Sequence, residues 1–98
     1  MKLKITEPVL SYEGKPIKDG TREINWRDVI YVALHNFQKD EIPTGEMKAK
    51  SYAITTKAYN ASEIDLTVNE VAYVLERIDK IYSDPLICGR AKDFFDKK

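Results

Sequence analysis

Residues 67–82 carry the strongest folding signal in the chain. Thr67 and Glu70 have the spacing of a capping box, in which each side chain accepts a hydrogen bond from the other residue's backbone N–H. The residues that follow repeat with the helical period and form one apolar face: Val71, Val74, Leu75, Ile78, Ile81 and Tyr82. We therefore expect a helix of about four turns at the centre of the hydrophobic core.

A second apolar series predicts a helix over residues 26–38, with Asn25 as its N-cap. Its apolar positions follow the i, i+3, i+4, i+7 series of one helical face: Trp26, Val29, Ile30, Ala33, Leu34 and Phe37. A weaker pattern predicts a further helix after Thr44, and its buried face would use Met47, Ala49, Tyr52, Ala53, Thr56 and Tyr59. The β-branched run at residues 54–56 lowers helix propensity in this segment.

A last helix is expected to start at Pro85, because Asp84 suits an N-cap and proline is tolerated at the first helical position. It would bury Leu86, Ile87, Ala91, Phe94 and Phe95. Gly89 lies inside this segment and costs about 1 kcal/mol relative to alanine. A glycine there indicates either a close helix crossing or a break into two short turns.

The first residues have the pattern of extended structure rather than a helix. Leu3, Ile5 and Val9 lie among polar neighbours, and Gly14 interrupts the pattern, so a β-hairpin over residues 2–18 is the simplest prediction. Pro8 lacks a backbone donor and favours an edge strand. With 98 residues, no internal repeat and no linker, we expect one compact α+β domain over residues 1–98: a short N-terminal β-hairpin followed by about four helices.

Charge and composition exclude several classes of function. Sixteen basic and sixteen acidic residues give no net charge, which argues against a polyanion binder that acts by bulk charge. No apolar run approaches the roughly 20 residues that cross a bilayer, so no membrane partner is expected. The first residues lack the apolar stretch of a secretory signal and Cys88 is the single cysteine, which favours a cytoplasmic location.

No motif in the sequence indicates catalysis. His35 is the only histidine and has no ligand-spaced partner, so we expect an exposed side chain and no metal or cofactor. Cys88 could be a reactive thiol, since Arg90 and a nearby helix start would lower its pKa. Buried, inert cysteines are common, and we favour that interpretation. The dispersed glycines form no phosphate loop, and we expect a protein that is not an enzyme.

Three tyrosines outside the main apolar faces, Tyr12, Tyr31 and Tyr73, have the apolar body and polar tip that suit protein interfaces. Tyr31 and Val32 also lie on a second side of the helix over residues 26–38. The sequence therefore predicts a protein partner, which includes a second copy of the chain, docked at Tyr12, Tyr31 and Val32. The alternative is that the N-terminal hairpin covers Tyr31 and Val32.

A nucleic-acid interface is a further alternative. Between residues 47 and 60 the only charges are Lys48, Lys50 and Lys57, and Tyr52 lies among them. Such a helix could contact phosphates. The competing interpretation is that the lysines pair with the acidic residues that follow: Glu63, Asp65 and Glu70.

The order of five segments resembles a family of small proteins encoded by bacteriophages and prophages. The segments are EPVLSYEGKPIKD (7–19), WRDVIYVAL (26–34), KAKSYAI (48–54), DLTVNEV (65–71) and DPLICGRA (84–91). The resemblance covers nearly the whole chain and implies an origin in phage biology and a host-cytoplasm setting. No catalytic residues and no biochemical role are carried over from the family. Within that setting, the small size, the balanced charge, the six tyrosines and the absence of catalytic clusters favour a non-enzymatic interaction protein: an assembly factor, a virion component or a factor that binds a host protein.

Overall fold

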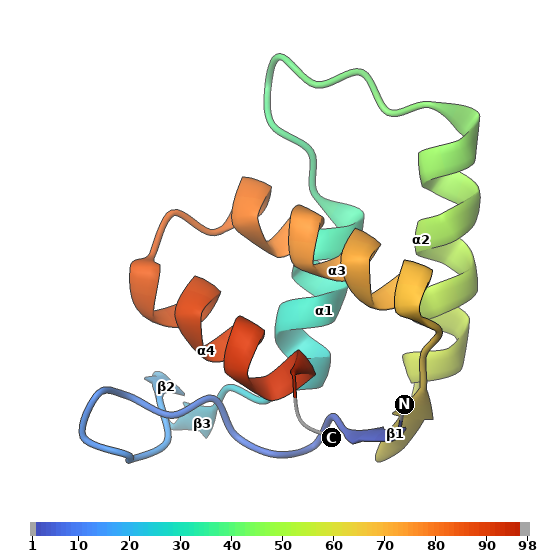
Figure 1. Cartoon of the computed structure of the whole chain (residues 1–98). Coiled ribbons are helices and arrows are strands. Elements are labelled where there is room, and N and C mark those ends of the chain that lie inside the picture. Colours follow the sequence, from blue (N-terminus) through green and yellow to red (C-terminus); the bar gives the residue numbers. More distant parts are fainter. Residues whose placement is uncertain (1, 97–98) are drawn as a thin grey trace.

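The computed structural model describes residues 2–96, which form four helices and two short antiparallel strand pairs (Figure 1). In chain order the elements are β1 (Lys2–Lys4), β2 (Lys18–Asp19), β3 (Arg22–Glu23), α1 (Trp26–His35), α2 (Gly45–Ala58), β4 (Glu63–Asp65), α3 (Val68–Ile81) and α4 (Pro85–Phe95). The expected class, an α+β domain with a short N-terminal strand pair and four helices, is confirmed. None of the helices within residues 2–96 is both long and apolar enough to span a membrane.

The predicted capping box starts α3. Thr67 Oγ1 accepts from the Glu70 N–H at 3.1 Å, and Glu70 Oε1 accepts from the Thr67 N–H at 2.9 Å. Figure 1 shows α3 between α2 and α4, crossing α1, and Val74 and Ile78 are fully buried there. The buried face is rotated from the expected one, because Tyr73 is buried whereas Leu75 is only half-buried.

The buried Tyr73 corrects its expected role as a surface residue. Its hydroxyl lies 2.9 Å from the Ser51 hydroxyl and donates to the Met47 carbonyl at 3.1 Å. These bonds satisfy the polar tip inside the core, which removes the main cost of burying a tyrosine.

The burial of Ser51 also explains why α2 presents a different face from the one expected. The residues that α2 buries fully are Ser51, Ile54 and Ala58, at i, i+3 and i+7. Tyr52 and Tyr59, expected in the buried face, are 74% and 75% exposed. The aromatic residues lie outside because the inner face of α2 is defined by its contacts with α1 and α3 rather than by its own hydrophobicity.

α1 ends at His35, three residues before the expected end, because Asn36 is extended. Phe37 therefore leaves the helix, and its ring lies 4.7 Å from the guanidinium carbon of Arg77. Arg77 on α3 is 1% exposed and donates to the carbonyl of Asn36 at 2.8 Å. It also contacts both carboxylate oxygens of Glu41, at 2.7 and 3.1 Å.

This bidentate ion pair attaches the connection between α1 and α2 to the core. The Arg77 guanidinium, together with the backbone N–H of Gln38, lowers the pKa of Glu41 from 4.5 to about 2. A buried arginine in α3 was not expected from the sequence, because its partner lies 36 residues away.

The N-terminal hairpin over residues 2–18 is replaced by two separate strand pairs. β1 pairs with β4, with Leu3 opposite Ile64, and β2 pairs with β3 around Gly20. Within the expected hairpin an isolated bridge joins Leu10 and Pro16, and the N–H groups of Ser11 and Ile17 donate to the carbonyls of Lys15 and Val9. The sequence pattern predicts no strand at residues 63–65, whereas the pairing of β4 with β1 buries Leu3 and Ile64 together.

The expected helix α4 forms, and it closes the core by packing against Trp26 at the N-terminal end of α1. Trp26 stacks on Phe94 with ring centroids 4.8 Å apart, and Phe95 meets the same indole edge-on. α4 continues through Gly89, and a Cβ atom there would meet nothing within 4 Å. Gly89 therefore marks neither a close helix crossing nor a break into two short turns, the two features predicted for it.

Candidate functional site

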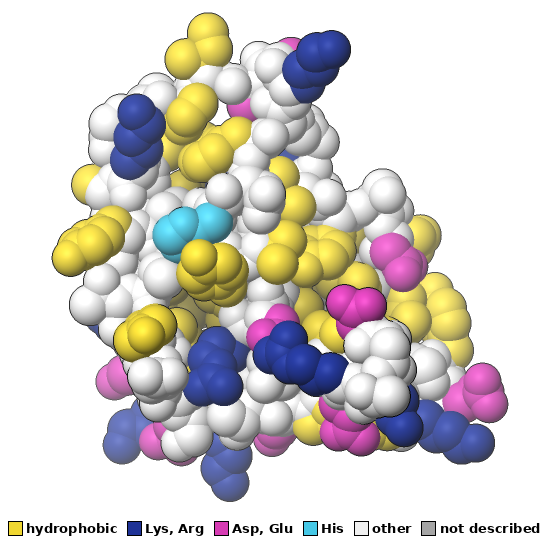
Figure 2. Space-filling view, turned by 180° about the vertical axis from the view of Figure 1, so that it is seen from behind, with side chains coloured by type: hydrophobic (Ala, Val, Ile, Leu, Met, Phe, Trp, Pro, Cys, Tyr) yellow, Lys and Arg dark blue, Asp and Glu magenta, His cyan; other side chains and the backbone are white. Residues whose placement is uncertain are grey.

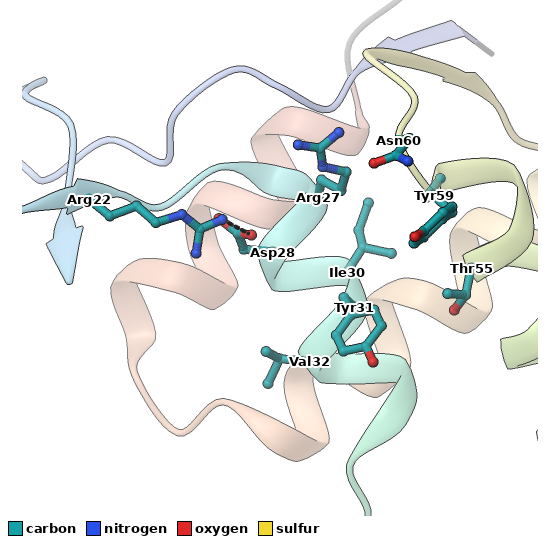
Figure 3. Close-up of a pocket in the computed structure, with 10 residues that line it drawn as sticks. Arg22, Arg27, Asp28, Ile30, Tyr31, Val32, Thr55, Tyr59 and Asn60 are labelled. Carbon is teal, nitrogen blue, oxygen red and sulfur yellow. Dashed lines mark hydrogen bonds and ion pairs between the residues drawn. The ribbon is translucent and has the colours of Figure 1, made fainter.

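A depression of about 500 Å³ opens between α1 and the C-terminal half of α2 (Figure 3). We call it the α1–α2 depression. Its lining comes from β3, α1, α2 and the turn after α2: Arg22, Arg27, Asp28, Ile30, Tyr31, Val32, Thr55, Ala58, Tyr59 and Asn60. Two of the residues predicted as a partner-binding surface, Tyr31 and Val32, thus lie together in one hollow.

Tyr31 lies on the outer side of α1 because successive helical residues turn by about 100°, which rotates it away from the buried Ile30. It remains 54% exposed, so the N-terminal strands do not cover it. Its ring stacks on the His35 ring at a centroid distance of 4.4 Å, and His35 Nε2 shares a hydrogen bond with Thr55 Oγ1 at 2.9 Å. These contacts hold Tyr31 beside α2.

The α2 side of the depression is formed where that helix ends. Tyr59 caps α2, and Asn60 follows with φ +55°, a left-handed conformation that asparagine adopts more readily than most residues. The chain therefore turns sharply and leaves the Tyr59 side chain exposed. Figure 3 shows Tyr31 and Tyr59 reaching the depression from its two sides, with Ile30 between them.

Two arginines and one aspartate border the depression. Arg22 Nη2 contacts Asp28 Oδ1 at 2.7 Å, and the other Asp28 oxygen accepts from the Asn25 N–H at 3.1 Å. Arg27 Nη1 donates to the Ala61 carbonyl at 3.1 Å. The aspartate is thus engaged within the protein at both oxygens. Figure 2 shows this side of the molecule, with hydrophobic side chains around the histidine and basic side chains below them.

Tyr12, the third predicted partner-binding residue, lies elsewhere. It is 77% exposed in the connection after β1 and lines a different hollow, against Pro85 and Leu86 of α4. Arg90 holds this connection against α4 by donating to the carbonyls of Leu10 and Ser11. The structure therefore does not bring Tyr12 together with Tyr31 and Val32.

The residues of the alternative nucleic-acid interface do not share one face of α2. A helix turns by about 100° per residue, which places Lys48 and Tyr52 on the opposite side from Lys50 and Lys57. Lys57 pairs with Glu70 at 2.8 Å, and Lys50 pairs with Glu46 at 3.1 Å. Two of the three lysines are thus neutralised within the chain.

The two side chains considered for catalysis lie apart from each other. Cys88 is half-buried in α4, where its thiol donates to the Tyr82 carbonyl at 3.3 Å, and burial raises its pKa. His35 contacts Thr55 and Tyr31. Among residues 2–96, no cluster of three or more His, Cys, Asp or Glu side chains could hold a metal ion.

Sequence reasoning missed Tyr59, Asn60 and the two arginines of the depression. Tyr59 was assigned to a buried face, and Arg22 and Arg27 carried no recognisable motif. An asparagine directly after a predicted helix end is the one local signal that could have pointed to the turn. No protein-family model, curated protein or solved structure matches this chain.

Proposed function

We propose that this protein is a non-enzymatic binding factor that docks another protein in the α1–α2 depression. The observation that carries the proposal is the pair of exposed tyrosines, Tyr31 and Tyr59, on the two sides of a hollow with Ile30 and Ala58 between them. Tyrosine and arginine are enriched at the energetic centres of protein interfaces. The depression combines both residue types with a concave apolar surface.

The phage resemblance of the sequence supplies the setting for this proposal. A small factor in the cytoplasm of a host cell would act by binding a virion component during assembly or by binding a host protein. The α1–α2 depression suits either role, because both require a specific protein contact and neither requires catalysis.

Nucleic-acid binding is less well supported. Lys50 and Lys57 already pair with glutamates, and Lys48 lies on another side of α2. Phosphate contacts would require breaking these pairs, which favours the protein-binding function.

Affinity capture from lysogenic or infected cells tests the proposal when it is done with matched variants. Tyr31→Glu places a charge in the depression, whereas Tyr52→Glu makes the same change on an exposed part of α2 outside it. We expect a captured protein that the wild type and Tyr52→Glu retain and that Tyr31→Glu loses. Identical capture by all three proteins would contradict the proposal.

Light scattering over a concentration series tests whether the partner is a second copy. A mass that doubles with concentration, and that Tyr31→Glu restores to the monomer, would identify self-association through this surface. A constant monomeric mass would leave a different protein as the partner.

A further inference from the structure

The polar lining of the α1–α2 depression holds two groups that can only donate hydrogen bonds, the guanidinium groups of Arg22 and Arg27. The Asn60 amide and the tyrosine hydroxyls can both donate and accept. The one carboxylate among the described lining residues, Asp28, has both oxygens engaged by Arg22 and by the Asn25 N–H. A ligand therefore meets donors that need acceptors.

Arg27 is the best placed of these donors. It is half-buried, and the one hydrogen bond that its side chain makes within residues 2–96 joins Nη1 to the Ala61 carbonyl. A guanidinium has five N–H groups arranged as a fork that fits a carboxylate. The bond to Ala61 fixes the side chain, and Nε and Nη2 keep donors for an incoming acceptor.

Arg22 adds a second positive charge at the border. One of its nitrogens pairs with Asp28, and its side chain is 70% exposed. The two arginines and one aspartate leave one net positive charge at the depression, although the whole chain is neutral. Local complementarity of this kind selects partners and orients them.

The apolar part of the depression indicates which kind of side chain lies beside the negatively charged group of the ligand. Ile30, Val32 and Ala58 lie among the lining residues beside the rings of Tyr31 and Tyr59. A volume of about 500 Å³ admits a few side chains. A free inorganic anion would leave this surface in contact with water, whereas a peptide with an apolar side chain next to an acidic one would cover it.

We infer that the partner docks through a short acidic segment, whose carboxylate binds Arg27 and whose neighbouring aliphatic or aromatic side chain packs between Tyr31 and Tyr59. This inference rests on the proposed function and specifies the chemistry of the partner. A nucleic acid fits less well, because a polyphosphate needs a row of cations and the α2 lysines that could extend the row are paired or on another side.

Two synthetic peptides test the inference directly. Both peptides have leucine and phenylalanine at the same positions. All the remaining positions are glutamate in the first peptide and lysine in the second. We expect the glutamate peptide alone to shift the backbone amide NMR signals of Tyr31, Thr55 and Tyr59 in the labelled protein. Equal shifts with both peptides, stronger shifts with the lysine peptide, or no shift of these amides would overturn the inference.

Matched variants locate the contacts. Arg27→Gln keeps a donor for Ala61 but loses the charge, and it should weaken binding of the glutamate peptide about tenfold. Lys48→Gln removes the same charge outside the depression and should leave binding unchanged. Tyr59→Ser should weaken binding whereas Tyr52→Ser should not, although the two tyrosines are equally exposed. Equal effects within either pair would overturn the assignment.

The same experiment separates this inference from the function on which it rests. If both peptides shift the depression amides equally, protein docking stands and the acidic preference fails. If neither peptide binds but Tyr31→Glu still abolishes capture, protein docking stands and only the inference of an acidic segment fails. If neither peptide binds and capture is unchanged, both proposals fail. Stronger shifts of these amides by oligothymidylate, or by raising the protein concentration alone, would assign the depression to nucleic acid or to a second copy.

Discussion

Replacing Ile54 with alanine tests how α2 is attached to the rest of the fold. Ile54 is 1% exposed and is the largest of the three side chains that α2 buries fully. Its neighbours in that face, Ser51 and Ala58, are small. The free energy that holds α2 in place therefore depends strongly on this one side chain.

The expected loss follows from the atoms removed. Isoleucine to alanine deletes three carbons, each worth about 0.8 kcal/mol of transfer free energy when buried, so the transfer term is about 2.4 kcal/mol. A cavity that the surroundings fail to fill adds up to about 2 kcal/mol. We expect Ile54→Ala to lower the free energy of unfolding by about 2 to 4 kcal/mol, a large share of the roughly 5 to 15 kcal/mol of a typical domain.

Urea unfolding measures this loss, with the fluorescence of Trp26 as the probe. Trp26 is the single tryptophan and is buried against α4, so its signal reports the core rather than α2 alone. Tyr52→Ala is the matched control, because it deletes a larger side chain from the exposed face of α2 and should change stability by about 0.5 kcal/mol or less. A loss below about 1 kcal/mol for Ile54→Ala, or a greater loss for Tyr52→Ala, would show that α2 buries the face expected from sequence instead.

Three further changes test other parts of the fold. The pKa of Glu41 is lowered from 4.5 to about 2, so its ion pair with Arg77 stabilises the fold fully above pH 4.5 and this contribution is lost as the pH falls towards 2. Glu41→Gln should therefore flatten the dependence of stability on pH in that window in acid titrations, and an unchanged slope would contradict the role of the pair. Gly89→Ala should stabilise the protein by about 0.5 to 1 kcal/mol in thermal or urea melts, because the added methyl meets no atom within 4 Å and alanine favours a helix; destabilisation would show that α4 has no room there. Burial raises the pKa of the Cys88 thiol, so iodoacetamide should label the native protein much more slowly than the urea-unfolded protein, as mass spectrometry would record; equal rates would revive a reactive thiol.

The helices that sequence reasoning placed best are those whose signals are local. The Thr67–Glu70 box and the Asn25 cap involve groups three residues apart, and the start of α4 depends on Asp84 and Pro85 alone. These contacts form within one helical turn, so neighbouring residues are sufficient to predict them.

The candidate site was only half predictable. Tyr31 and Val32 stood out because α1 already had a complete apolar face without them. Tyr59 and Arg27 complete the depression, but their positions depend on how α2 packs against α1 and on the turn at Asn60. Neither is encoded in a repeating pattern.

The sequence by itself determined the class of the fold, the starts of the helices and the core faces of α1 and α4, because each depends on periodicity and capping among near neighbours. Only the tertiary structure decided the pairing of β1 with β4, the burial of Arg77 and the inner face of α2. Each of these joins residues far apart in the chain, such as Leu3 with Ile64 or Ser51 with Tyr73. Burial of a polar side chain requires a hydrogen-bond partner, and Ser51 and Arg77 find theirs in Tyr73 and Glu41, which lie 22 and 36 residues away and are therefore in no local pattern.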